Sequence, residues 1–260
     1  MAPWLEQPAW PAPAGVRAVL SLRGGGVSRP PYDLLNLGDH VGDRPQDVAA
    51  NRAAFAAALD ARPVFLQQVH GSQVVCLDAA TPDGTQADGC VSTALGVACT
   101  IMVADCLPVL LTTADGAAVA AAHAGWRGLA GVAGQGIVEA AWGRFWPLAG
   151  EHENEVAART LAWLGPCIGP QAFEVGGEVR AAFEAADARA AACFAPAGAP
   201  GKWLADLQGL ARLRLRALGI EAIHGNDGST GWCTVSNPSR FFSHRRDGIS
   251  GRFAASIWLA

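Results

Sequence analysis

The stretch from residue 96 to residue 122 contains three short apolar runs, GVACTIMV (96–103), LPVLLT (107–112) and AAVAAA (117–122). Runs of this length with few polar residues are typical of strands that are buried on both faces of a sheet. We therefore expect three buried strands here. Cys106 precedes the second run and His123 follows the third, so both are expected at strand ends, where side chains from neighbouring strands can converge.

Further strands and helices are predicted on both sides of this stretch. Asp43, Pro45 and Asp47 are start signals for an alanine-rich helix that ends near Leu59. Two apolar runs flank Gly71 and indicate two strands or one bent strand. The predicted strands are 16–22, 63–70, 72–77, 160–164 and 253–259, and the other predicted helices are 128–145, 174–186 and 206–218.

The composition is that of a folded globular protein. Of 260 residues, 51% are hydrophobic and 16% are charged, which excludes disorder and predicts a large core. The apolar runs are interrupted too often to span a membrane, and a net charge of −4 gives no basic surface for a nucleic acid polymer. We expect a single domain over 16–260 after a proline-rich segment over 1–15; no oligomeric state follows from the sequence.

The N-terminal segment and the cysteines indicate the compartment. Residues 1–15 lack a basic start followed by an apolar stretch, and their prolines would break a signal helix. Seven cysteines without a Cys-x-x-Cys pair indicate reduced thiols rather than a disulfide framework. We therefore expect a cytoplasmic protein.

Three short motifs, QVHG (68–71), ADCL (104–107) and HAGWRG (123–128), each offer one metal ligand beside an apolar run. His70, Cys106 and His123 together supply two imidazoles and one thiolate, a set that suits zinc and leaves a fourth tetrahedral position open. The ligands are 36 and 17 residues apart, which fits no local zinc finger, so only the tertiary fold can assemble the site. On spacing alone, isolated histidines and cysteines are more often structural residues.

Five further motifs accompany these three: SLRGGGVS (21–28), LNLGDHVGD (35–43), LGPCIGP (164–170), FEVG (173–176) and FFSHRRD (241–247). With the three ligand motifs they make the chain closely similar to the YfiH family, also described as laccase-domain proteins or multicopper polyphenol oxidases. The resemblance implies an α/β (α+β) fold, in which helices cover a two-sheet core in α/β/β/α layers.

The resemblance also implies a chemistry. It implies zinc bound by His70, Cys106 and His123, and a purine nucleoside phosphorylase that cleaves adenosine, inosine or methylthioadenosine with phosphate to the free base and a ribose 1-phosphate. Adenosine deamination is implied as a further reaction. Zinc deaminases use a glutamate in a His-x-Glu motif, which neither ligand histidine begins, so we expect deamination to be secondary.

Copper is the alternative metal, because two imidazoles and one thiolate also describe a blue-copper centre. A laccase needs a trinuclear copper cluster with many more imidazoles in addition. The remaining histidines are His40, His152, His224 and His244. Four imidazoles are too few for that cluster, so the sequence favours zinc.

Phosphorolysis needs a site for the anion and groups that bind the sugar and the base. Arg127 follows His123 by four positions and offers a guanidinium fork for phosphate, although it is equally well explained as a surface arginine. Arg23 opens a triple-glycine loop that could approach phosphate or ribose, although such loops are more often simple turns. Asn36 and His40 are candidates for ribose or base contacts, although asparagine more commonly forms turns.

Three further residues are candidates near the metal ligands. Asp105 precedes Cys106 and is expected to orient a metal ligand, to polarise a substrate hydroxyl or to cap backbone amides at a strand end. His244 and Arg245 lie in a charged run that is expected either to contact substrate or to form a solvated rim. Family members frequently carry tyrosine where this chain has His244.

Two functions of other classes stay open at this point. Cys106 with His70 or His123 would also serve as nucleophile and base of a Cys-His amidase, and some family relatives are linked to editing of peptidoglycan precursors. A zinc-stabilised binding scaffold without catalytic activity would need a fourth protein ligand. Asp88, His40 or Cys90 could supply it.

Overall fold

The three apolar runs form three strands that belong to two different sheets. This computed structural model describes residues 2–260. Strand β6 (Val97–Val103) lies in a five-stranded sheet, whereas β7 (Leu107–Thr113) and β8 (Val119–Ala124) are antiparallel neighbours in a six-stranded sheet. Every residue of the three strands is buried. The prediction of three buried strands is therefore confirmed.

The two sheets take their strands from distant parts of the sequence. The five-stranded sheet has the order β1-β2-β14-β6-β3, and the six-stranded sheet has the order β13-β9-β7-β8-β5-β4. The other strands of the first sheet are β1 (Leu5–Glu6), β2 (Val16–Ser21), β14 (Phe253–Leu259) and β3 (Arg62–Phe65). Those of the second are β13 (Ala222–Gly225), β9 (Thr160–Leu164), β5 (Gly89–Ser92) and β4 (Val74–Cys76).

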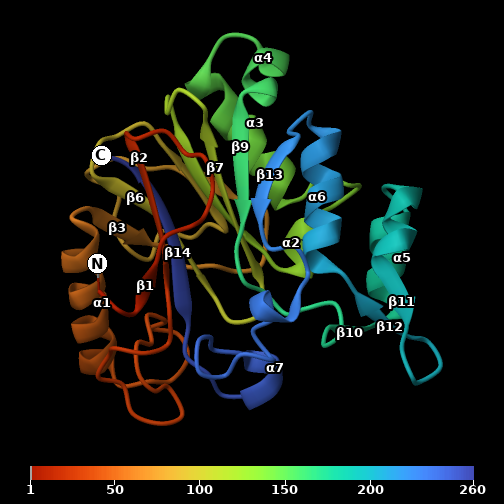
Figure 1. Cartoon of the computed structure of the whole chain (residues 1–260), viewed down its shortest axis with the longest axis horizontal. Helices are drawn as coiled ribbons and strands as arrows, with labels where there is room; N and C mark the ends of the chain where they lie inside the picture. The colour runs from red at the N-terminus through yellow and green to blue at the C-terminus, as the bar shows by residue number, and fades with distance from the viewer. Residues whose placement is uncertain (1) are drawn as a thin grey trace.

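Helices cover the outer face of each sheet, so the molecule has the predicted α/β/β/α layers (Figure 1). Helix α1 (Pro45–Leu59) packs on the five-stranded sheet, and α3 (Ile137–Ala149) and α6 (Leu207–Ala217) lie over the six-stranded sheet. Alternation along β6 explains the burial of both its faces, since Ile101 contributes to the core between the sheets and Met102 to the core under α1.

Two stretches of the sequence, 63–77 and 174–186, are each divided between two elements. β3 and β4 are separate strands in different sheets, so the chain crosses between the sheets at residues 66–73, and His70 lies in that crossing. Residues 174–186 were expected to be one helix, but β10 (Glu174–Gly176) precedes α5 (Gly177–Glu184). β10 belongs to a small third sheet with β12 (Lys202–Ala205) and β11 (Phe194–Pro196), which the sequence did not predict.

The helix predicted over 128–145 is wrong, because the chain forms two helices there. α2 (Trp126–Ala130) ends at Gly131, and α3 begins only after Gly136. Gly131 has φ 63°, in the left-handed region, and its hydrogen faces the Gln135 carbonyl so closely that no side chain fits. The glycines that looked tolerable in one helix instead build the turn between two.

The remaining short elements lie in loops. They are α4 (Glu153–Ala158), the 3₁₀ turns Ala188–Cys193 and Thr230–Trp232, and α7 (His244–Asp247). Met1, the first residue of the predicted segment 1–15, lies outside the described residues, and Leu5–Glu6 of that segment pair with β2. Among residues 2–260, no helix combines the length and apolar character needed to cross a membrane.

The break between α2 and α3 gives a matched pair of glycine substitutions. We expect Gly131→Ala to lower the free energy of unfolding by more than about 2 kcal/mol, because the methyl group would clash with the Gln135 backbone and alanine would have to adopt a positive φ. Gly143→Ala, at an exposed position of α3 where an added methyl would meet no atom within 4 Å, should raise it by about 0.5–1 kcal/mol. Urea unfolding of both variants checks this, and equal effects would contradict the two-helix arrangement.

Candidate metal centre

His70, Cys106 and His123 converge at one end of the layer between the two sheets. Their candidate ligand atoms all lie within 4.8 Å of one another, and the two imidazole centroids are 4.7 Å apart. Each residue comes from a different place: the crossing between β3 and β4, the crossing between β6 and β7, and strand β8. The tertiary fold thus assembles the three residues whose spacing fits no local motif.

The Asp88 carboxylate fixes the loop that carries His70. It accepts hydrogen bonds from the backbone N–H groups of Val69 at 3.1 Å, His70 at 2.8 Å and Gly71 at 2.7 Å. His70 itself has φ 61°, an unfavourable conformation for a residue with a side chain. Three hydrogen bonds to one carboxylate stabilise this turn, and they confirm the bend expected at His70.

Asp88 also orients the second imidazole. Its Oδ1 lies 2.8 Å from Nδ1 of His123, and both side chains are buried. Burial by itself raises the pKa of Asp88, but the hydrogen bonds from His123 and Gly71 outweigh it and the pKa is lowered. The ionised carboxylate therefore holds Nδ1–H, so that Nε2 of His123 is the ring nitrogen that would bind a metal once its proton is lost, an arrangement that is common around zinc.

Cys106 is held ready as a thiolate. Burial raises its pKa, but the charges and hydrogen bonds of His123 and His70 outweigh burial and lower the pKa to about 6. For His123 burial is likewise opposed, by Cys106 and Asp88, which raise its pKa to about 9. A thiolate is the form of cysteine that binds metal.

Two glycines of the HAGWRG motif leave space for the ligands. A methyl on Gly125 would lie 2.9 Å from Sγ of Cys106 and 3.0 Å from Cδ2 of His70. A methyl on Gly128 would lie 2.8 Å from the Gly71 carbonyl oxygen. Glycine at these positions lets β8 and α2 approach the two other ligand loops closely.

The three ligands border a cavity of about 390 Å³. Two nitrogens and one sulfur within 4.8 Å of one another are a donor set that suits a zinc ion, and the same three residues line the cavity. The carboxylate oxygens of Asp88 accept hydrogen bonds from four N–H groups, so Asp88 is not placed as a fourth metal ligand. The remaining lining residues are His40, Gln68, Met102, Val103, Ala104, Asp105, Trp126, Arg127, Ile168, Phe173, Leu207, His244, Arg245 and Arg252.

Five of the seven other predicted site residues line this cavity: Asp105, Arg127, His40, His244 and Arg245. Arg23 and Asn36 do not. Arg23 donates to the carbonyls of Asp33 and Pro238 and stacks 4.9 Å from the Phe242 ring. Asn36 is fully buried and bonds within its own loop and to the backbone of Arg252.

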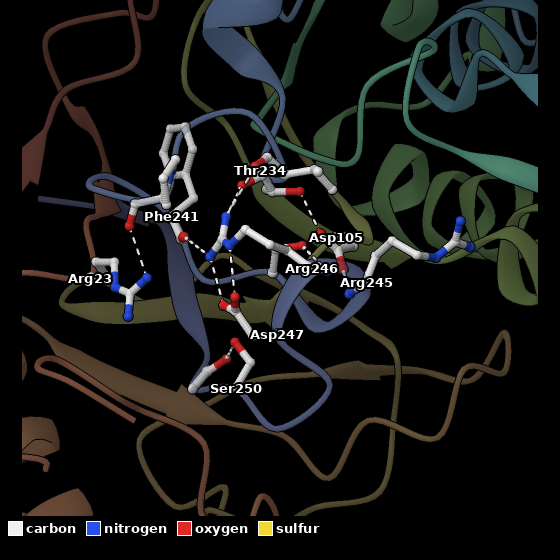
Figure 2. A network of polar contacts seen from close by, with 12 residues as sticks. Arg23, Asp105, Thr234, Phe241, Arg245, Arg246, Asp247 and Ser250 are labelled. Carbon is white, nitrogen blue, oxygen red and sulfur yellow. Dashed lines mark hydrogen bonds and ion pairs between the residues drawn. The ribbon is translucent and has the colours of Figure 1, made fainter. Parts of the chain in front are cut away.

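The Asp105 carboxylate connects the loop that carries Cys106 to the C-terminal loop, which contains Thr234 and Arg245 (Figure 2). It accepts from the Thr234 hydroxyl at 2.5 Å and from the Arg245 backbone N–H at 2.6 Å. Of the roles expected for Asp105, this contact corresponds to the capping of a backbone amide at a strand end. Because Asp105 directly precedes Cys106, this contact couples the position of α7 to the loop that carries Cys106.

Arg246, which the sequence did not single out, is the centre of that loop (Figure 2). Its guanidinium donates to the carbonyls of Thr234 and Phe241 and forms an ion pair with Asp247 at 2.7 Å. The Arg245 side chain points away from this network and donates to the Glu174 carbonyl at 3.1 Å. In the charged run, Arg246 therefore stabilises the loop, whereas His244 and Arg245 line the cavity.

Sequence reasoning missed the aromatic residues and one arginine of the cavity. Trp126, Phe173 and Arg252 come from three separate segments and line it together. Trp126 lies in the HAGWRG motif and Phe173 in FEVG, so the motifs carried a signal for both. Arg252 lies in no such motif, and only the fold brings it to the site.

The contacts of Asp88 give a test of metal binding. We expect Asp88→Asn to weaken zinc affinity about 10- to 100-fold, because the amide loses the charge and presents an NH₂ group to N–H donors. Competition with a chromophoric chelator measures the affinity. Asp83→Asn is the matched control, since Asp83 accepts a backbone N–H from Phe65 in the same connection but contacts no ligand. Unchanged affinity in Asp88→Asn would contradict this role.

Known proteins resemble this chain over nearly its full length. A Pseudomonas aeruginosa protein named purine nucleoside phosphorylase PA4543 is 50% identical, with 98% of each chain covered. The Escherichia coli purine nucleoside phosphorylase YfiH is also 50% identical, with 97% of each covered. The crystal structure of Neisseria meningitidis protein NMB0706 superposes with a TM-score of 0.89 at 41% identity, covering 98% of this chain and 99% of that one. Residues 17–260 match the family described as multi-copper polyphenol oxidoreductase laccase, and the chain belongs to this family, which includes the YfiH proteins.

Proposed function

We propose that this protein is a zinc-dependent purine nucleoside phosphorylase. The observation that carries the proposal is the open set of His70, Cys106 and His123 at the border of a cavity of about 390 Å³. Relatives with half of their residues identical bear the name purine nucleoside phosphorylase. We propose adenosine, inosine and methylthioadenosine as substrates and adenosine deamination as a secondary reaction.

The lining of the cavity suits a purine nucleoside. Trp126, Phe173, Ile168 and Leu207 give an apolar wall with two aromatic rings, on which a purine ring can stack. The guanidinium of Arg245 lies 5.6 Å from the centroid of Phe173 and can donate to the departing base. Such donation stabilises the negative charge that develops on the leaving group.

Positive charge in the cavity suits phosphate as the second substrate. Arg127, Arg245 and Arg252 all line it, whereas Asp105 is its only acidic lining residue among those described. Asp105 is already bound to Thr234 and the Arg245 backbone. Bound zinc would supply a Lewis acid that holds an anionic oxygen near the reacting centre. Together the arginines would give the cavity the positive charge that balances a bound phosphate.

The Cys-His amidase and the binding scaffold are less well supported. Cys106 serves as a free nucleophile only where no metal occupies its sulfur, and the short spacing to both imidazoles favours ligation. A closed structural zinc site needs a fourth ligand, but Asp88 is engaged with backbone N–H groups and His123. Copper stays the less favoured metal, since His152 and His224 do not line the cavity.

We infer that the protein works in the cytoplasm. Within residues 2–260, which contain all seven cysteines, none of them forms a disulfide, and Cys76 is exposed. Unpaired thiols suit a reducing compartment.

Zinc-quantified protein tests the reaction directly. We expect about one zinc per chain and conversion of adenosine to adenine that requires phosphate, with ribose 1-phosphate as the second product. Chromatography of the bases with and without phosphate measures this, and sulfate at equal ionic strength is the control. Adenine released equally in sulfate would indicate hydrolysis, and no adenine with zinc and phosphate present would overturn the proposal.

Substitution of Cys106 separates a metal ligand from a nucleophile. Cys106→Ala should lose zinc and activity together, because two imidazoles hold zinc weakly. Cys106→Asp restores an oxygen ligand without a thiol and should recover part of both zinc content and phosphorolysis. Zinc analysis and initial rates measure the effect. Full zinc content in Cys106→Ala, or zinc-loaded but inactive Cys106→Asp, would favour a nucleophilic cysteine.

A further inference from the structure

Arg252 stands immediately before β14 and contributes a positive charge to the lining of the cavity. It lines the same cavity as the three metal ligands. Among residues 2–260, no carboxylate forms an ion pair with it. Burial lowers its pKa, although the charges of Cys106 and Asp105 oppose this. A partly desolvated guanidinium that pairs directly with no carboxylate among the described residues is costly for a fold, and a bound anion reduces that cost.

Most of the Arg252 donors are unused. Nη1 donates to the carbonyls of Ser250 at 2.9 Å and Gly251 at 3.0 Å. Nε and Nη2 donate to no group in the described chain. Nε and Nη2 together form one edge of a guanidinium, the edge that binds two oxygens of a phosphate at once. The bonds of Nη1 hold the group in place, so this edge is preorganised.

The LNLGDHVGD motif holds Arg252 in position. Oδ1 of Asn36 accepts from the backbone N–H of Arg252 at 2.8 Å and from that of Gly38 at 2.9 Å, and the Leu37 N–H donates to the Arg252 carbonyl at 3.0 Å. A methyl on Gly38 would lie 2.7 Å from Cγ of Arg252. The motif thus fixes the Arg252 backbone and leaves room for its side chain.

The two other cavity arginines have different surroundings. Arg127 is exposed and stacks 4.6 Å from the Trp126 ring, and Arg245 is bound to the Glu174 carbonyl beside Phe173. Both therefore adjoin the aromatic wall. Arg252 instead shares the cavity lining with His40, whose pKa is lowered by burial and by the charge of Arg252. Arg127 and Arg245 thus contact aromatic rings, whereas Arg252 has no such contact among the described residues, and all three line the cavity together with the ligand set.

We propose that Arg252 binds the phosphate co-substrate and that Asn36 and Gly38 are its positioning residues. This inference rests on the proposed phosphorylase function and deepens it. The purine then lies against Trp126 and Phe173, and inorganic phosphate lies at Arg252. The ribose lies between them, so phosphate reaches the sugar carbon from the side opposite to the base. The C–N bond to the base breaks with its electron pair leaving on the purine, a C–O bond to phosphate forms, and the proton of the attacking hydrogen phosphate passes to the purine.

Substitution of Arg252 tests the phosphate site. In zinc-loaded Arg252→Gln we expect the KM for phosphate, and the Kd for inorganic phosphate by calorimetry, to rise about 10- to 100-fold. The KM for adenosine and the zinc content should change less than about twofold, within the range of an indirect effect. Arg252→Lys keeps the charge and should recover part of the affinity.

Arg212→Gln is the matched control for loss of a half-buried arginine. Arg212 also donates only to backbone carbonyls, those of Ile223 and Asn226, and burial lowers its pKa too, but it does not line the cavity. Its phosphate affinity should equal that of wild type. Gly38→Ala keeps every charge and should weaken phosphate binding by displacing the Arg252 side chain, which provides a second test if Arg252→Gln folds poorly.

The outcomes separate this inference from the proposed function. If Arg252→Gln and Gly38→Ala cleave nucleoside in a phosphate-dependent reaction with unchanged phosphate affinity, the Arg252 site is overturned and the phosphorylase is kept. If Arg127→Gln loses the affinity instead, the phosphate site lies at Arg127. Phosphate binding that depends on Arg252 in a wild type that cleaves no nucleoside keeps the site and overturns the phosphorylase. Adenosine 5′-monophosphate that binds more tightly than adenosine only when Arg252 is present would assign the site to a phosphate ester and overturn the inorganic phosphate.

Discussion

The buried Asp88 carboxylate is the constraint on which the candidate metal centre depends. It stands just before β5 and accepts three N–H groups of the His70 turn together with Nδ1–H of His123. A buried carboxylate is costly unless its lone pairs are filled, and here four donors fill them. One side chain therefore fixes the backbone of one metal ligand and the ring orientation of another.

The two-sheet architecture supplies the rest of the site. The chain crosses from the five-stranded to the six-stranded sheet at residues 66–73 and again at 104–106, and each crossing carries one ligand. The third, His123, follows Val119 and Ala121 on the face of β8 that meets the core between the sheets. The C-terminal loop covers the same end through the contact of Asp105 with Thr234 and Arg245. The C-terminal part of the cavity wall is thus anchored on the loop that carries Cys106.

The sequence predicts elements well where a local pattern determines them and poorly where tertiary contacts do. Strand β14 (Phe253–Leu259) has the predicted bounds because its apolar run is buried on both faces. The helix over 128–145 was wrong because helix propensity tolerates single glycines, whereas close packing at Gly131 and Gly136 requires them. Arg252 could not be predicted, since what distinguishes it is the absence of an acidic partner among the described residues, which no residue pattern encodes.

The chemistry of the cavity argues for anion handling rather than electron transfer, in spite of the laccase description of the family. Oxidation of phenols needs several metals that exchange electrons, and the imidazoles of His152 and His224 lie outside the cavity lining. The cavity instead combines one ligand trio with three guanidinium groups and two large aromatic rings. Guanidinium groups in a partly desolvated site gain most when a multiply charged anion enters. A multiply charged anion is therefore what this surface is best suited to bind.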